Sequence, residues 1–117
     1  MDQKLINAVK KQLGDDTYLT DVNNGGADAG FPGFTYYTDT VKFFKQNKTE
    51  IVKLVKEYAE EFGQSPIEFV TGFNCLKGIV TEEEVATALY GHIGNNDVTV
   101  ANALSWFALE EVARLEE

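Results

Sequence analysis

The stretch of sequence that decides the fold is residues 98–115, VTVANALSWFALEEVARL. Its first three turns are apolar on nearly every side and include Trp106 and Phe107. A helix that is apolar all round has to be covered on several sides, either by other helices or by a second copy of the chain. The sequence therefore predicts that these residues form the central helix of the domain.

Amphipathic segments that can cover this helix occur along most of the chain. Apolar residues recur at helical spacing in residues 2–13, 48–62 and 81–93, and a further helix is expected from Pro66 to about Lys77. Each of these segments has polar residues on its other side. They are typical of helices that pack one face against a shared core.

Local capping signals mark where two of these helices begin. Ser65 precedes Pro66 and stands three residues before Glu68, and Thr81 stands three residues before Glu84. This spacing allows the hydroxyl and the carboxylate to bond reciprocally to backbone amides, as in a capping box. Both helix starts are therefore predicted from local chemistry alone.

The boundary near Asn47 is open. A helix can begin at Thr38 or Asp39, and Asn47 with Glu50 again has capping-box spacing. The sequence permits either a new helix at this point or one helix that continues through Asn47.

These elements predict a mainly α fold, a compact bundle of five or six helices around the C-terminal helix, in one domain over residues 1–117. The glycine-rich residues 23–33 are predicted to form an ordered loop. Residues 18–22 and 34–37 can each form a short strand, so one β-hairpin is also allowed.

Composition and charge narrow the function classes. The 117 residues carry a formal net charge of -9, and neither a secretory signal nor a membrane span is evident, so we expect a cytoplasmic protein without direct nucleic-acid or membrane binding. Residues 79–117 hold eight acidic residues and one basic residue. This anionic segment either keeps the protein soluble or attracts basic partners.

The chain offers little for metal or nucleophilic chemistry. Cys75 and His92 are the only cysteine and histidine, whereas a zinc site needs three or four ligands. Cys75 lies among apolar residues, where an inert buried thiol is the usual outcome, and His92 near a helix end can interact with the helix dipole. We therefore predict no catalytic residue, no metal site and no cofactor.

The glycine-rich loop has two interpretations. It lacks both the Gly-Lys-Ser/Thr ending and the spacing of nucleotide-binding loops. Asn24 and Asp28 can bond to loop amides, while aromatic side chains can either fix the loop on the core or form a binding surface. These aromatic residues are Phe31, Phe34, Tyr36 and Tyr37.

Two separated motifs carry a family resemblance, GADAGFPGFTYYTDT at residues 26–40 and NALSWFALEEVAR at residues 102–114. The chain resembles a family of small uncharacterised proteins of phages, plasmids and prophages. The resemblance implies a mobile-element context and assigns no catalytic residue. Small acidic proteins from such elements often bind host defence proteins, which is an analogy of context rather than a property of these residues.

The leading functional hypothesis is a non-enzymatic protein-binding module that inhibits a host defence factor. Its expected partner is a host protein, basic or nucleic-acid-binding, and a homodimer is also allowed. The alternatives are a small ligand-binding protein or enzyme that uses residues 23–37, and a structural or assembly protein. The candidate binding residues are Asn24, Asp28, Phe31, Phe34, Tyr36, Tyr37, Glu110 and Glu111.

Overall fold

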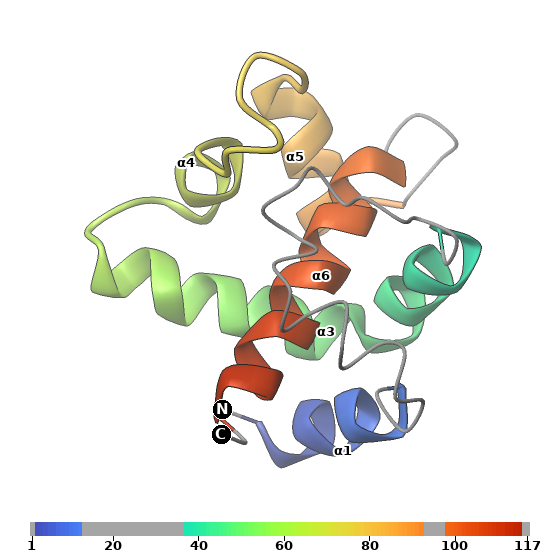
Figure 1. The fold of residues 1–117 in the computed structure, drawn as a ribbon. Helices are drawn as coiled ribbons and strands as arrows, with labels where there is room; N and C mark the ends of the chain where they lie inside the picture. The colour runs from blue at the N-terminus through green and yellow to red at the C-terminus, as the bar shows by residue number, and fades with distance from the viewer. Residues whose placement is uncertain (1, 13–36, 93–97, 116–117) are drawn as a thin grey trace.

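The computed structural model describes residues 2–12, 37–92 and 98–115, and these residues form helices without any strand. The mainly α prediction is confirmed, with five helices in this part of the chain (Figure 1). The glycine-rich loop and the hairpin fall outside the described residues and stay predictions. The helices are α1 (Gln3–Gln12), α3 (Tyr37–Glu61), α4 (Pro66–Thr71), α5 (Glu82–Tyr90) and α6 (Val98–Leu115).

The last helix, α6, lies at the centre of the bundle, as predicted. It packs most extensively against α3 and also contacts α1 and α5, while α4 packs against α3 and α5 (Figure 1). Helices of the same chain therefore cover the apolar sides of α6. Nine of the ten residues from Val100 to Leu109 are at most 4% exposed, namely Val100, Ala101, Asn102, Ala103, Leu104, Ser105, Trp106, Ala108 and Leu109.

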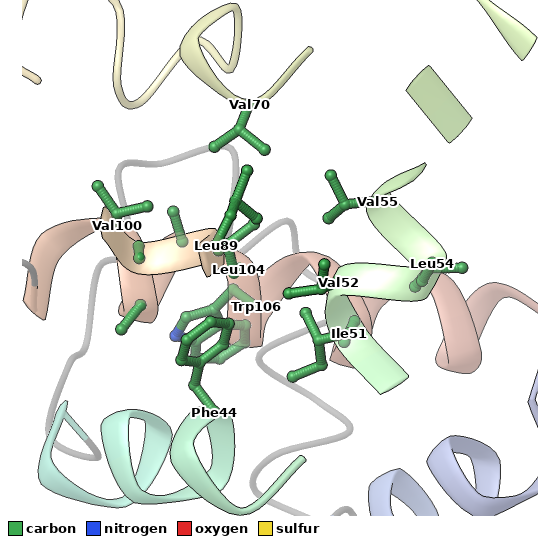
Figure 2. Packing of buried hydrophobic residues seen from close by; sticks show 14 of the residues in the cluster. Phe44, Ile51, Val52, Leu54, Val55, Val70, Leu89, Val100, Leu104 and Trp106 are labelled. Atoms are coloured by element: carbon green, nitrogen blue, oxygen red, sulfur yellow. The ribbon is translucent and has the colours of Figure 1, made fainter. Parts of the chain in front are cut away.

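Trp106 is the largest of the fully buried side chains. Figure 2 shows it in one cluster with Phe44 and Ile51 of α3, Leu89 of α5 and Val70 of α4. A side chain of this size gains several kilocalories per mole from burial, because burial stabilises by about 25 cal/mol for each Å² of apolar surface. The indole therefore lies in one core to which α3, α4, α5 and α6 all contribute.

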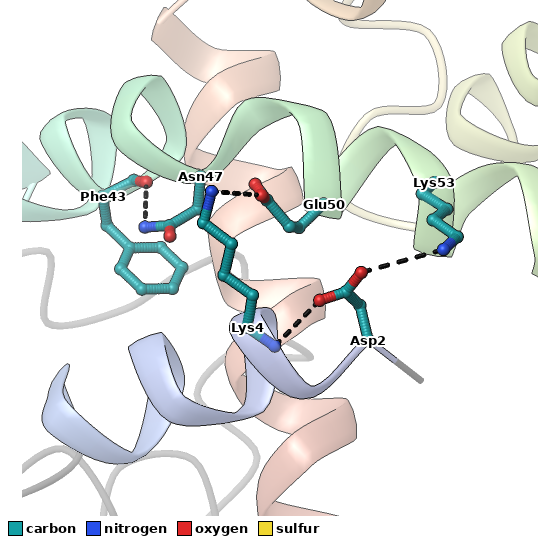
Figure 3. Close-up of polar contacts among 6 residues, drawn as sticks. All are labelled: Asp2, Lys4, Phe43, Asn47, Glu50 and Lys53. Atoms are coloured by element: carbon teal, nitrogen blue, oxygen red, sulfur yellow. Dashed lines mark hydrogen bonds and ion pairs between the residues drawn. The ribbon is translucent and has the colours of Figure 1, made fainter.

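The backbone of α3 departs from helical geometry at Asn47, which has φ −122° and ψ 21°. The Asn47 amide donates to the Phe43 carbonyl oxygen at 2.9 Å, and the Glu50 carboxylate pairs with Lys4 of α1 at 3.1 Å (Figure 3). α3 therefore consists of two helical segments that meet at a kink at Asn47. Both side chains make contacts other than the capping box that their spacing allowed.

Two ion pairs and buried apolar residues join α1 to α3. Besides the Lys4–Glu50 pair, Lys53 lies 3.7 Å from the Asp2 carboxylate, and Asp2 also accepts from the backbone N–H of Lys4 (Figure 3). Leu5 and Val9 on the same helix are fully buried. Exposed ion pairs contribute little, so the buried residues supply most of the stabilisation of this contact.

Both predicted capping boxes are present. Ser65 Oγ accepts from the Glu68 amide at 3.1 Å, and Thr81 Oγ1 accepts from the Glu84 amide at 3.1 Å. In each box the glutamate carboxylate accepts in return from the N-cap amide. Local sequence alone is sufficient to place these two helix starts.

The helix that starts at Pro66 is shorter than expected, because it ends at Thr71 instead of continuing to about Lys77. Residues 72–79 form turns in which Phe73 donates to the Val70 carbonyl and Leu76 donates to the Phe73 carbonyl. Gly72 and Asn74 are poor helix formers, and Gly78 has a left-handed φ of 72°. The turns bury Leu76 while leaving Gly72 exposed.

We predict that Trp106→Ala lowers the free energy of unfolding by about 3 to 5 kcal/mol, because it opens a cavity in the centre of the core. Urea denaturation followed by circular dichroism measures this loss. Thr99→Ala is the control on the same helix, since Thr99 is exposed, and it should change stability by less than about 0.5 kcal/mol. Equal stabilities for the two variants would contradict the central position of Trp106.

Candidate functional site

The structure places only some of the candidate binding residues. Tyr37 is the first residue of α3, and its side chain is not described. Glu110 and Glu111 lie on α6. The remaining candidates, Asn24, Asp28, Phe31, Phe34 and Tyr36, lie outside the described residues and stay predictions.

Five aromatic side chains from separate parts of the chain form one continuous cluster, which we call the aromatic surface. Its centre is Phe69 of α4, whose ring lies 5.8 Å from Phe107 of α6 and 5.3 Å from Phe73, both in edge-to-face geometry. Tyr58 of α3 completes the inner part, with its ring 5.4 Å from that of Phe107. The cluster therefore consists of Tyr58, Phe62, Phe69, Phe73 and Phe107.

Phe62 is the exposed edge of the aromatic surface. Its side chain is 66% exposed, and its ring stacks on Phe69 with a centroid distance of 6.0 Å and an interplanar angle of 13°. The backbone turns directly after it at Gly63, which has φ 68°. An exposed phenyl ring is thus held in place by a half-buried one, which makes its position well defined.

Glu111 occupies a different environment from the one expected of a recognition surface. It is 8% exposed and accepts a hydrogen bond from the Tyr58 hydroxyl. Glu110 is half-buried. The exposed carboxylates next to the aromatic surface in sequence belong instead to Glu57, which precedes Tyr58, and Glu61, which precedes Phe62.

Sequence reasoning missed the aromatic surface. Tyr58 and Phe62 are four residues apart, as are Phe69 and Phe73, so each pair has the spacing of neighbours on a helix. That pattern is also typical of an ordinary core stripe. The signal that would have helped is the position of Phe62 next to Gly63 at a helix end, where a buried side chain is less expected.

The acidic start of α5 has a structural explanation. Glu84 takes part in the capping box with Thr81, and Glu82 and Glu83 lie in the first turn of the helix. Carboxylates are stabilised there by the positive end of the helix dipole. These three residues therefore provide weaker support for a recognition surface than their number suggests.

Neither Cys75 nor His92 joins a cluster of ligands. Cys75 is half-buried in the turns after α4 and packs against the core, and His92 is exposed after the C-cap of α5. Within the described residues, no group of three or more His, Cys, Asp or Glu side chains could hold a metal ion. None of the helices described here is long and apolar enough to cross a membrane.

Comparison with known proteins gives one match. A family model described as Domain of unknown function (DUF7222) matches residues 2–115, nearly the whole chain. No curated protein and no solved structure matches.

We predict that Tyr58→Phe lowers the free energy of unfolding by about 1 to 3 kcal/mol, because it removes a donor to a buried carboxylate. Chemical denaturation of the variant measures the loss. Tyr90→Phe makes the same chemical change at a tyrosine that is 55% exposed, so it should leave stability nearly unchanged. If Tyr58→Phe is as stable as this control, the Tyr58–Glu111 bond does not stabilise the fold.

Proposed function

The chain belongs to the family of the domain of unknown function DUF7222, and we propose that it is a non-enzymatic module that binds another protein through the aromatic surface. The binding site would be Phe62 with the half-buried rings behind it. The observation that carries the proposal is the stacking of the exposed Phe62 ring on Phe69.

An exposed and ordered aromatic ring is well suited to protein recognition. Single apolar side chains are common on protein surfaces, but Phe62 is continuous with four other rings. Large aromatic residues contribute strongly to binding when they are buried at an interface. A ring that is already fixed by stacking also loses less conformational entropy when the partner binds.

The charge beside the aromatic surface favours a basic partner. Glu57 and Glu61 are exposed next to Tyr58 and Phe62, and the whole chain has a formal net charge of -9. Acidic rim residues increase the rate of encounter with a positively charged protein and suppress binding of acidic ones. A basic or nucleic-acid-binding host protein has the complementary charge.

The biological context of the proposal comes from the two sequence motifs. They resemble proteins of phages, plasmids and prophages, and a small acidic binder from such an element would inhibit a host defence factor in the cytoplasm of the bacterial host. The alternatives at residues 23–37 lie outside the described residues. They stay predictions, as does a structural role.

We predict that Phe62→Ala weakens capture of the partner from a lysate of the source organism, because the variant removes the exposed part of the aromatic surface. Quantitative mass spectrometry of the retained proteins measures the change. Ile79→Ala is a matched control, since Ile79 is 67% exposed but lies outside the aromatic surface. A protein retained by the wild type and Ile79→Ala, and depleted about tenfold or more with Phe62→Ala, supports the proposal.

The melting temperatures of both variants should stay close to that of the wild type, because both side chains are mainly exposed. Binding of the captured protein should also weaken as salt rises, since the acidic rim contributes to encounter. Equal capture by the wild type and by folded Phe62→Ala would exclude the aromatic surface as the binding site.

A further inference from the structure

Positive charge in this acidic chain is concentrated on one segment of α3. Five of the ten lysines and arginines of the protein lie within residues 42–56, and only one carboxylate, Glu50, lies in the same segment. Glu50 is buried and pairs with Lys4 of α1. The surface of this segment is therefore cationic, although the formal net charge of the protein is -9.

Part of this segment lines a groove against the end of α5. One section has a volume of about 470 Å³ and contains Lys48, Lys53 and Lys56 together with Tyr90. Val52 and Leu89 lie at its base and are at most 9% exposed. This section thus combines an apolar base with an exposed aromatic ring and three lysines.

The other section is more polar. It has a volume of about 330 Å³ and is lined by Lys45, Lys48, Gly91 and His92. Lys48 lines both sections, so the two are adjacent, and together we call them the lysine groove.

The contacts that the described residues make with the groove lysines leave N–H groups available for an anion. The Lys48 ammonium donates to the Gly91 carbonyl oxygen, which uses one of its three N–H groups, and Lys56 lies over the Tyr90 ring at 5.7 Å. Within the described residues only Lys53 of this set has a carboxylate partner, Asp2 at 3.7 Å. Among the described residues, Lys45, Lys48 and Lys56 therefore have no carboxylate partner, so this part of the chain leaves the groove with a net positive charge.

We infer that the lysine groove binds a nucleotide unit, either a free nucleotide or one within a short single strand. The phosphate would lie against Lys45 and Lys48, and the nucleobase would lie over Val52 and Leu89 beside Tyr90. Lysine binds phosphate as a point charge, and aromatic side chains stack on every type of base. The volume is also within the range of ordinary small-molecule sites.

The net charge of the chain does not exclude this ligand. Exposed charges more than about 8 Å apart are largely screened at physiological salt, so a single nucleotide responds mainly to the groove. A long duplex would contact a larger and more acidic surface. The expectation of no direct nucleic-acid binding therefore still applies to duplexes. The inference changes it only for a short single-stranded ligand.

An acidic peptide is the competing ligand, and the groove fits it less well. Lysine ammonium groups attract a carboxylate as well as a phosphate, so charge alone does not separate the two ligands. The exposed Tyr90 ring and the apolar floor of the groove, however, have no counterpart in an aspartate or glutamate side chain. A nucleotide uses both features.

The test uses the full chain, with 2′/3′-(N-methylanthraniloyl)-ATP, ATP and a fluorescein-labelled oligo(dT) octamer as probes at about 50 mM salt, where charge contacts are strong. We expect saturable binding measured by fluorescence anisotropy, with ATP competing for the labelled nucleotide. In two-dimensional NMR spectra the amides of residues 45–56 and 89–91 should shift. Whether ATP or the octamer binds more tightly identifies the source of the nucleotide unit.

The double variant Lys45→Gln/Lys48→Gln should weaken binding at least about tenfold, and Tyr90→Ala should weaken it about fivefold or more. Lys42→Gln/Lys77→Gln is the matched control, because it removes the same charge from exposed lysines that do not line the groove. This control should bind nearly as well as the wild type. All these residues except Lys48 are exposed, so circular dichroism should show intact folds.

Three results would overturn the inference. The first is no binding of either nucleotide probe at low salt by the folded wild type. The second is equal weakening by the groove variant and the control, which would indicate diffuse charge. The third is tighter binding of hexaglutamate or of tripolyphosphate than of ATP and the octamer, which would show that the nucleobase does not contribute to binding. The inference does not depend on the aromatic surface, so Phe62→Ala should bind nucleotide normally.

Discussion

Burial of α6 is the constraint on which the rest of the structure depends. Its residues are apolar on nearly all sides, and α1, α3 and α5 each cover part of it. The α3–α6 contact is the most extensive, and the Trp106 indole lies in the cluster that joins these helices (Figure 2). Because interiors are closely packed, the contact with α6 restricts where each covering helix can lie.

The parts of the fold that sequence predicted are those determined by local chemistry or by a strong apolar pattern. The Ser65 and Thr81 capping boxes need only residues three positions apart. The central position of the helix at residues 98–115 follows from its apolar composition. The predicted end of α4 near Lys77 was wrong, because the helix ends at Thr71 with Gly72 as its C-cap, and the turns that follow bury Leu76. Tertiary packing determines where α4 ends, and the local periodicity of the sequence does not predict it.

The candidate site was less predictable, because it depends on residues far apart in the chain. Tyr58 and Glu111 are 53 positions apart, so their hydrogen bond was not evident, and Glu111 alone resembled a surface carboxylate. The aromatic surface combines α3, α4 and α6 in the same way. The lysines of α3 had the pattern of an ordinary solvated face, and only their position opposite Tyr90 shows the groove.

The charges at the C-terminal end of α3 are opposite in sign to those that would stabilise an isolated helix. Lysines occupy residues 42–56, whereas Glu57, Glu60 and Glu61 lie in or near the last turn, which contains no basic residue. A helix dipole favours cations at the C-terminal end by about 0.3 to 1 kcal/mol each, so this arrangement carries a small cost. In α1 the last turn contains Lys10 and Lys11, as the dipole favours. Helix stability therefore does not account for the acidic last turn of α3, whereas the binding role proposed for the residues around Phe62 would.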